Sequence, residues 1–527
     1  MKIFPLHAAD FYKVGHPMMI PEDTVVIYST FTPRGTRVPW ADEIVFFGLQ
    51  YFLQEFLVRN WNDEFFFKPK AKVVRKYQRR MDSSLGPGTV PVAHIEALHD
   101  LGYLPLVIKA VPEGTLVPMR TPMLTIRNTK HGDKRFAWLT NYLESLLSCV
   151  LWKPCTSATT AFHYRKEFER HMRLTDGPMD FVKWQGHDFS FRGMSGPEDA
   201  ALSGAAHLLS FTGTDTILAI DFLEDYYGAD SNTELIGGSI PATEHMIHMV
   251  ASEGLTRDEC VDSDYNTFKR LITKIYPDGP ISVVSDTWNF WKVLKVLIPG
   301  LKTEILARNG RLVIRPDSGE PVHIVSGYRV NEIVIDYSED QPKYFFKSDD
   351  KIAEEMTDAE FLGAYEYLYT MFPGPTTEKG YKQLDTHIGL IYGDSITMQR
   401  QRDILARLEE KGFCASNLVL GIGSYTYQYV TRDTYMMAMK ATFAETVDGR
   451  QKEIFKDPIT DSGMKKSARG LVRVNKDMTY TDGVTWEEEA TGMLQPVFVD
   501  GVIVRRTTLA AIRATIEEHL KKEKYQK

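Results

Sequence analysis

Four short apolar runs between residues 281 and 424 dominate the hydrophobic pattern of this chain. Each run leads into an acid, an Arg-Pro-Asp sequence or a glycine turn, and the four are Ile281–Asp286, Arg311–Gly319, Ile388–Asp394 and Leu418–Ser424. Continuous apolar runs bounded by turn residues are typical of strands buried in a parallel sheet. In β/α barrels the reactive groups follow the carboxyl ends of such strands, and the last loops often hold a phosphate. We expect that arrangement here.

Residues 1 to about 130 alternate strand signals with helical ones. β-Branched and aromatic residues between Pro and Gly predict strands over Thr24–Phe31, Leu104–Val111 and Pro122–Ile126. Apolar residues at helical spacing then predict a core-facing helix from Arg135 to Trp152. We expect a sheet-rich α+β domain over residues 1–180.

Residues 181–425 alternate short β runs with helical stretches, which predicts βα units within one α/β domain. Its first helix should begin near Gly196-Pro-Glu-Asp199, because proline and acids suit a helix amino end. Residues 325–385 separate two of the predicted strands by more than one helix requires. We expect an insertion there with a hairpin and an acidic helix, and loops of that length are more often surface elaborations than catalytic lids.

Residues 426–527 form a basic, sheet-like segment that ends in an amphipathic stretch, Thr507–Lys522. That stretch predicts a closing helix, and we expect the segment to pack back on the first domain and complete it.

Composition points to an ordinary enzyme in the cytoplasm. Charged residues make up 25% of the 527 residues and the formal net charge is −8, so no overall basic field favours nucleic acid. The four cysteines, at 149, 155, 260 and 414, lack metal or disulfide spacing, as expected in a reducing compartment. We find neither an uncharged apolar stretch of membrane-spanning length nor a signal-peptide pattern.

Two motifs suit a flat, amide-bearing ring. Phe189 and Arg192 lie three residues apart before a helix, where an aromatic face can stack on a heterocycle and a guanidinium can meet phosphate or a carbonyl. Asp215 follows a buried run and can accept hydrogen bonds from an amide NH₂. Structural packing and loop capping are the alternative interpretations of these residues.

His245 follows a proline-marked strand end, where histidine can move protons or attack phosphate. A structural histidine is the alternative. Asp286 ends the next predicted strand, so it could orient His245 or bind a hydroxyl. Glu244-His245-x-x-His248 does not predict zinc, because no third ligand is evident.

Three strand-end motifs suit a phosphorylated sugar. Arg315 and Asp317, on either side of Pro316, could bind pyrophosphate with the cation and ribose hydroxyls or magnesium with the acid; a plain salt bridge is the alternative. Gly393-Asp394 and Gly423-Ser424 place backbone N–H groups close to helix starts, a seat for a 5′-phosphate.

In their order along the chain, these motifs resemble the nicotinamide phosphoribosyltransferase family over roughly residues 7–500. The matching motifs are Asp10-Phe-Tyr12-Lys13, Arg34, Phe189 with Arg192, Gly213-Thr-Asp215-Thr, Pro241-Ala-Thr-Glu-His245, Ser282-Val-Val-Ser-Asp286, Arg315-Pro-Asp317-Ser-Gly319, Gly393-Asp394, Thr431-Arg432-Asp433 and Phe455-Lys456-Asp457-Pro458.

The resemblance implies a type II phosphoribosyltransferase fold, in which an irregular α/β barrel joins a sheet-rich second domain. It implies the reaction of nicotinamide with 5-phosphoribosyl 1-pyrophosphate to give nicotinamide mononucleotide and pyrophosphate, a step of NAD salvage. ATP would be a co-substrate that stimulates the reaction through a phosphohistidine. Mg²⁺ would be held mainly by substrate phosphates, and active sites would be shared across a homodimer.

The resemblance also implies roles for single residues. Phe189 and Tyr12 of the partner subunit would sandwich the pyridine, and Asp215 would accept from its carboxamide. His245, supported by Asp286, would be phosphorylated, and Asp317 would hold the ribose. Further substrate contacts would come from Arg192, Arg315, Gly393, Asp394, Gly423 and Ser424, and contacts to pyrophosphate or ATP from Asp10, Arg34, Arg432, Lys440 and Lys456.

Three features depart from the family pattern. Ser424-Tyr425 replaces a run of glycines, Ser190-Phe191 replaces Gly-Tyr, and the 325–385 insertion is longer than expected. The alternatives are a nicotinate phosphoribosyltransferase, which Asp215 disfavours by charge, and a non-catalytic nucleotide-binding or secreted relative. Intact His245, Asp286, Arg315 and Asp317 count against the latter.

Overall fold

The computed structural model describes residues 3–129, 133–338, 342–347, 354–393, 395–460 and 466–522. The chain divides into two compact units. The sheet unit comprises residues 1–162, 221–234 and 430–519, and the barrel unit comprises residues 163–220, 235–429 and 520–527. The boundary expected at residue 180 therefore lies inside the barrel unit, and residues 221–234, expected in the barrel domain, belong to the sheet unit.

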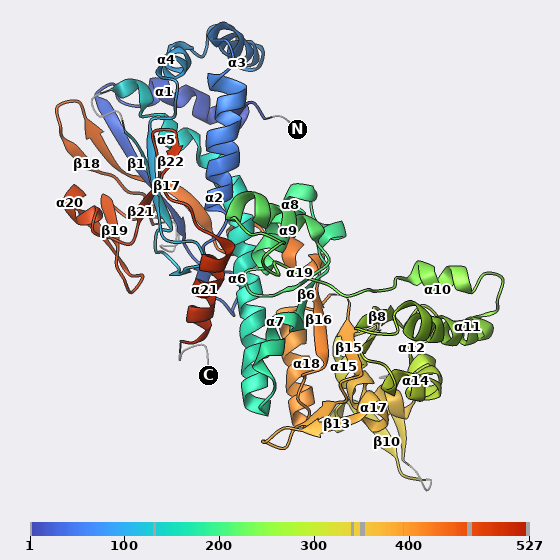
Figure 1. Ribbon diagram of the computed structural model, residues 1–527. Coiled ribbons are helices and arrows are strands. Elements are labelled where there is room, and N and C mark those ends of the chain that lie inside the picture. The colour runs from blue at the N-terminus through green and yellow to red at the C-terminus, as the bar shows by residue number, and fades with distance from the viewer. Residues whose placement is uncertain are drawn as a thin grey trace. The chain divides into compact units, whose positions relative to one another are not determined.

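The barrel unit is built on six parallel strands in the order β7-β6-β16-β15-β9-β8. Their bounds are β6 Gly186–Asp188, β7 Gly213–Thr214, β8 Ile281–Val284, β9 Leu312–Arg315, β15 Ile388–Tyr392 and β16 Leu418–Ile422. β6, β16 and β15 run side by side in Figure 1, and β9 separates β15 from β8. The four runs predicted from the apolar pattern are thus neighbouring strands of one parallel sheet, as expected.

One irregular segment links the two edges of this sheet. Gly238 makes a parallel bridge to Gly213 of β7, and Ala242 makes a parallel bridge to Ser282 of β8. The backbone N–H of Ser282 donates to Pro241 O at 2.9 Å. Because both edge strands are bridged by the same short segment, the curled sheet becomes an irregular barrel.

Helices connect the strands of the barrel unit. α8 begins at Pro197 with Glu198 and Asp199 in its first turn, which confirms the predicted helix start. The helices between residues 182 and 428 include α7 Val182–Gln185, α8 Pro197–His207, α9 Ile217–Tyr227, α10 His245–Ala251, α11 Arg257–Arg270, α15 Pro321–Ser326, α18 Met398–Glu410 and α19 Ser424–Gln428.

The 325–385 insertion contains the predicted hairpin, made by β10 Ile333–Asp336 and β11 Lys343–Phe346. The single acidic helix expected there is instead two short helices, α16 Asp358–Leu362 and α17 Ala364–Met371. Gly363 separates them with a φ of +79°, a conformation that side chains with a Cβ rarely adopt.

The sheet unit holds a seven-stranded antiparallel sheet in the order β18-β17-β1-β5-β3-β21-β22. Its strands are β1 Thr24–Pro33, β3 Leu106–Ala110, β5 Leu124–Asn128, β17 Met437–Thr446, β18 Gln451–Glu453, β21 Gln495–Val499 and β22 Val502–Ile503. The three amino-terminal strands predicted from sequence are confirmed. β17 pairs with the whole length of β1, so the carboxyl-terminal segment does pack back on the first one.

Two predicted helices are confirmed with different bounds. The closing helix is α21, Leu509–Leu520. The helix expected over residues 135–152 is interrupted at Leu143, between α5 Leu139–Tyr142 and α6 Glu144–Thr175. No helix among the described residues is long and apolar enough to cross a membrane.

Candidate active site

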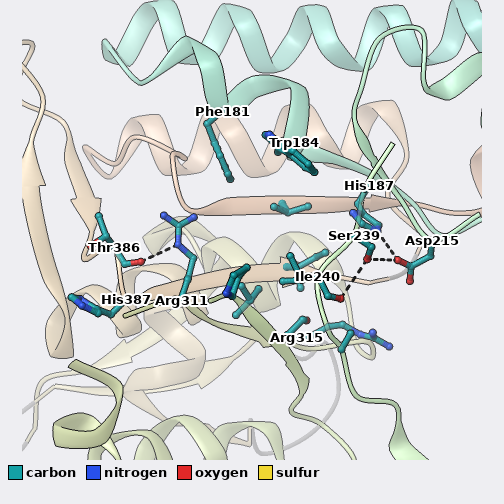
Figure 2. Close-up of a pocket in the computed structure, with 18 of the residues that line it drawn as sticks. Phe181, Trp184, His187, Asp215, Ser239, Ile240, Arg311, Arg315, Thr386 and His387 are labelled. Carbon is teal, nitrogen blue, oxygen red and sulfur yellow. Dashed lines mark hydrogen bonds and ion pairs between the residues drawn. The ribbon is translucent and has the colours of Figure 1, made fainter. Parts of the chain in front are cut away.

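Two connected cavities mark the barrel unit. The inner cavity, about 650 Å³, runs through the barrel from Asp215 and Arg315 to Phe181, Thr386 and His387 (Figure 2). The outer cavity, about 790 Å³, lies at the carboxyl ends of the strands. Of the site residues predicted from sequence, those that line the outer cavity are Phe189, Arg192, Asp215, Arg315, Asp317, Gly393, Gly423 and Ser424.

Asp215 is held by two side chains of the barrel unit. Its Oδ1 accepts from His187 Nε2 at 2.9 Å and from Ser239 Oγ at 2.7 Å, and Figure 2 shows both side chains directed at it. Burial opposes ionisation, but the hydrogen bond and charge of His187, with Ser239 and Arg315, outweigh it and lower the pKa of the Asp215 carboxyl. Asp215 is therefore an anion at neutral pH, with Oδ2 left for a donor in the cavity.

Phe189 offers a flat face next to this acid. The Arg315 guanidinium lies 5.7 Å from its ring centroid, and the His187 ring lies at 4.5 Å. Gly421 of β16 leaves room for the ring, because a Cβ there would come within 2.7 Å of Phe189 Cδ2 and within 2.9 Å of the Tyr392 carbonyl oxygen. A residue larger than glycine would displace either the ring or the neighbouring strand.

The Arg315-Pro-Asp317 turn is fixed by Asp286. Asp286 Oδ2 accepts from the backbone N–H of Asp317 at 2.8 Å and from Ser318 Oγ at 2.6 Å. Asp317 Oδ2 in turn lies 3.7 Å from Arg315 Nη2. Asp286 Oδ1 and Arg315 Nε are buried with no hydrogen-bond partner among the described residues, so each retains bonding capacity for a ligand.

The expected support of His245 by Asp286 is wrong in this structure. His245 Nδ1 lies 3.0 Å from Thr287 Oγ1, and its Nε2 lies 3.9 Å from Asp317 Oδ2. The physical reason is that Asp286 turns toward the backbone N–H of the neighbouring strand's loop, which leaves Thr287 and Asp317 to face the imidazole.

Two late loops close the outer cavity. Glycine is needed at position 393, because a Cβ there would lie 2.7 Å from Asp317 Oδ1. In the other loop, Ser424 begins α19 directly after Gly423. Asp394 lies outside the described residues. Ser424 packs against Gly193, where a Cβ would fall 2.0 Å from Ser424 Oγ. The serine that replaces a family glycine is therefore accommodated by the glycine after Arg192.

The predicted phosphate-binding cations belong to the sheet unit. Arg34 and Lys440 line a cavity of about 280 Å³ together with Arg120 and Lys466. Burial lowers the pKa of Lys440, and the charges of Arg34 and Lys456 lower it further against the effect of Glu144. We call this the cationic cavity, and it suits an anion with several oxygens.

The remaining predicted residues lie apart from the cationic cavity's lining. Arg432 is exposed and pairs with Asp433 at 3.2 Å. Asp10 accepts from Ser145 Oγ at 2.5 Å, and Tyr12 is 63% exposed on the short helix Phe11–Gly15.

The sequence interpretation missed several residues that organise the site. His187 and Ser239 hold Asp215, Thr287 and Ser318 contact His245 and Asp286, and Arg120 joins the cationic cavity. His187 could have been predicted from the sequence, because residues two apart on an extended strand lie on the same face and His187 lies two residues before Phe189. Nothing in the sequence pattern marks the others.

Comparison with known proteins agrees with this geometry. The family model described as "Nicotinate phosphoribosyltransferase (NAPRTase) family" matches residues 184–501, and "Nicotinamide phosphoribosyltransferase, N-terminal domain" matches residues 5–73. A nicotinamide phosphoribosyltransferase of Acinetobacter baylyi is 47% identical over 98% of this chain and 98% of its own length. One from Mycoplasma genitalium is 33% identical over 88% of this chain and 94% of its own length.

Solved structures share the fold. A nicotinate-nucleotide pyrophosphorylase from Pyrococcus furiosus aligns with a TM-score of 0.54 and 13% identity over 99% of this chain and 96% of its own. Human nicotinic acid phosphoribosyltransferase aligns with a TM-score of 0.51 and 15% identity over 98% of this chain and 95% of its own. Both likenesses concern the fold alone.

Proposed function

Because the chain belongs to the nicotinamide phosphoribosyltransferase family, we propose that its barrel site joins nicotinamide to 5-phosphoribosyl 1-pyrophosphate, giving nicotinamide mononucleotide and pyrophosphate in NAD salvage. The observation that carries this proposal is Asp215, an anion held by His187 and Ser239 beside the face of Phe189. A pyridine stacked on Phe189 presents its carboxamide N–H to Asp215 Oδ2.

The chemistry needs charge stabilisation more than a base, because the pyridine nitrogen is already nucleophilic. Cleavage of the bond between the anomeric carbon and pyrophosphate builds positive charge on the sugar and negative charge on the leaving group. Asp317 favours the oxocarbenium-like sugar, and Arg315 favours the departing pyrophosphate. Alignment of the ring nitrogen with the anomeric carbon by the aromatic face supplies much of the remaining rate.

Asp215 selects the amide over the acid. A second carboxylate at about 4 Å from Asp215 would be repelled by roughly 1 to 4 kcal/mol, between the dielectric of water and that of a protein surface. Nicotinamide accordingly outcompetes nicotinate. A nicotinate phosphoribosyltransferase remains the second candidate, because the family model that covers most of the barrel bears that name.

ATP is proposed to act through His245. His245 Nδ1 lies 3.0 Å from Thr287 Oγ1. In the tautomer in which Nδ1–H donates to that hydroxyl, Nε2 carries the lone pair that attacks the γ-phosphate. The bond from the γ-phosphate to the ADP oxygen breaks as the bond from Nε2 to phosphorus forms. The side chain is 42% exposed, so a nucleotide can reach it.

Magnesium fits this site as an ion held mainly by substrate phosphates. Asp317 and the free Oδ1 of Asp286 offer oxygen ligands, while the described residues contain no group of three His, Cys, Asp or Glu side chains that could hold a metal alone. When bound, magnesium would neutralise phosphate charge and stabilise the leaving pyrophosphate.

A homodimer with shared active sites is the proposed assembly. We propose that Tyr12 of the partner subunit completes the aromatic sandwich, and that the partner's cationic cavity binds the pyrophosphate or ATP phosphates. The exposed Tyr12 ring and the cations that line the cationic cavity support this proposal. We place the enzyme in the cytoplasm, where its four free thiols would stay reduced.

Mass detection of product tests the proposed function. Purified protein with nicotinamide, phosphoribosyl pyrophosphate and Mg²⁺ should form nicotinamide mononucleotide and pyrophosphate, faster when ATP is present. His245→Ala should keep the ATP-independent reaction and lose the stimulation. A protein that forms no mononucleotide from either pyridine would be a non-catalytic relative.

A further inference from the structure

Three buried side chains near His245, the first residue of α10, are joined by hydrogen bonds. Asp264 Oδ1 of α11 lies 2.8 Å from His248 Nδ1 of α10, and His248 Nε2 lies 3.3 Å from Thr243 Oγ1. Asp264, His248 and Thr243 are 2%, 0% and 7% exposed. We call these three residues the relay.

The hydrogen bonds of the relay continue into the barrel wall. Because a carboxylate accepts, His248 donates from Nδ1–H to Asp264, and His248 Nε2 shares a second hydrogen bond with the Thr243 hydroxyl. Thr243 Oγ1 also accepts from the backbone N–H of Val284 at 2.9 Å. Removing any one member leaves a buried polar group without its partner.

The relay ties α10 to the barrel wall. The backbone N–H of Thr243 donates to Ser282 O at 3.0 Å, and Val284 donates to its side chain, so Thr243 is anchored to β8 by both backbone and hydroxyl. Thr243 also lines the outer cavity. A buried line of hydrogen bonds thus runs from α11 to the rim of the substrate site.

His248 is the main anchor of the helix that presents His245. The structure describes all seven residues of α10, and His248 is the one that is buried. Met246, Met249 and Val250 are exposed, so apolar packing does little to orient the helix. His245 begins the same turn of helix that ends at His248, and its direction therefore depends on where His248 is held.

Burying the polar side chains of Thr243, His248 and Asp264 costs desolvation free energy, and stability alone does not explain why they are there. Replacing buried charged and polar groups by apolar side chains of similar volume is often neutral or stabilising. We propose that Thr243, His248 and Asp264 are positioning residues that set the direction of the His245 imidazole toward Asp317. This inference rests on the proposed role of His245 as phosphoryl acceptor.

Two measurements test the relay separately from ATP coupling. The first is the rate at which diethyl pyrocarbonate modifies His245, read by peptide mass spectrometry with His387 of the barrel unit as internal reference. The second is the ratio of nicotinamide mononucleotide formed with ATP to that formed without it. Thr243→Val removes the hydroxyl without changing shape, and Asp264→Leu breaks the far end of the relay away from the cavity.

Thr243→Ser and Ser326→Ala serve as matched controls. Thr243→Ser keeps the hydroxyl and should give wild-type values. Ser326→Ala removes a buried hydrogen bond of α15, from Ser326 Oγ to Val322 O at 2.6 Å, and should leave both measurements unchanged.

We expect Thr243→Val and Asp264→Leu to change the His245 modification rate relative to His387 and to reduce ATP stimulation about tenfold, since displacement of a reacting group by about 1 Å can cost ~10²-fold. Wild-type modification and stimulation in both variants would overturn the relay. If wild type shows no ATP stimulation, the ATP role of His245 fails, and the modification rates still decide the relay. If Asp264→Leu does not fold, Thr243→Val judged against Thr243→Ser decides it.

Discussion

The two ends of the barrel site hold their main side chains differently. Asp215 follows a strand of the sheet and receives hydrogen bonds from two side chains. His245 begins a short exposed helix and has a hydroxyl as its hydrogen-bond partner. In the proposed function, a group that selects a base by charge must not move, whereas a group that receives phosphate must be reachable by a nucleotide. The comparison therefore separates a fixed acid, Asp215, from an accessible imidazole, His245.

The largest loss of activity should come from replacing Arg315. Arg315→Ala removes the cation that faces both the ring of Phe189 and the carboxylate of Asp317. We expect kcat/KM for nicotinamide mononucleotide formation to fall by about 10²–10³, as for loss of a group that stabilises transition-state charge. Steady-state kinetics measure this. A loss smaller than about fivefold would mean that Arg315 does not meet the leaving group.

Asp215→Asn should shift base selection. Loss of the negative charge removes a repulsion of roughly 1 to 4 kcal/mol toward nicotinate, so the preference for nicotinamide should fall about tenfold or more. Initial rates with each pyridine at matched concentrations measure the ratio. An unchanged ratio would show that the fixed end of the site does not select by charge.

His207, which holds the strand before Asp215, should make the free energy of unfolding depend on pH. His207 lies between Tyr427 OH at 2.8 Å and Gly213 O at 3.0 Å, and burial lowers its pKa to about 4. Because the folded-state pKa lies below the unfolded value, its neutral form stabilises the fold above pH 6.5, and this contribution is lost as pH falls toward 4.

At pH 5 that loss should be about 2 kcal/mol of unfolding free energy relative to pH 7. Denaturant unfolding of wild type and His207→Gln at both pH values measures it. His207→Gln should show a smaller drop than wild type, while His163 and His171 continue to contribute in both proteins. An equal decrease of unfolding free energy in both proteins would show that groups other than His207 cause the acid sensitivity.

Ser239→Ala should have the smallest effect. It removes one of the two hydrogen bonds to Asp215 Oδ1 and leaves that from His187. We expect KM for nicotinamide to rise about threefold to tenfold with little change in kcat, which corresponds to about 1 kcal/mol for one hydrogen bond. A kcat loss without a KM change would show that Ser239 acts on the chemical step.

The sequence predicted the strands of the site well and their side-chain contacts less well. Continuous apolar runs identify β8, β9, β15 and β16 because strands buried on both faces leave no polar positions. The partner of Asp286 could not be predicted, since adjacency of two strand ends does not say which loop a carboxylate faces. The relay was hidden for the same reason: Thr243, His248 and Asp264 have unremarkable spacing and meet only through the packing of α10 on α11.

Domain boundaries were also beyond the sequence pattern. Helical periodicity continues through α6 and α9, although the chain passes from one compact unit to the other within both helices. Such a passage changes the partners of a helix and not its spacing. The motif resemblance was more informative, and the comparisons confirm the family that it indicated.

Direct competition between the two pyridines tests the central claim most directly. Wild-type protein would be given equal concentrations of nicotinamide and nicotinate with limiting phosphoribosyl pyrophosphate, and both mononucleotides would be quantified by mass. The fixed Asp215 anion predicts that nicotinamide mononucleotide is the dominant product. Equal amounts of the two products, or an excess of nicotinate mononucleotide, would contradict the account.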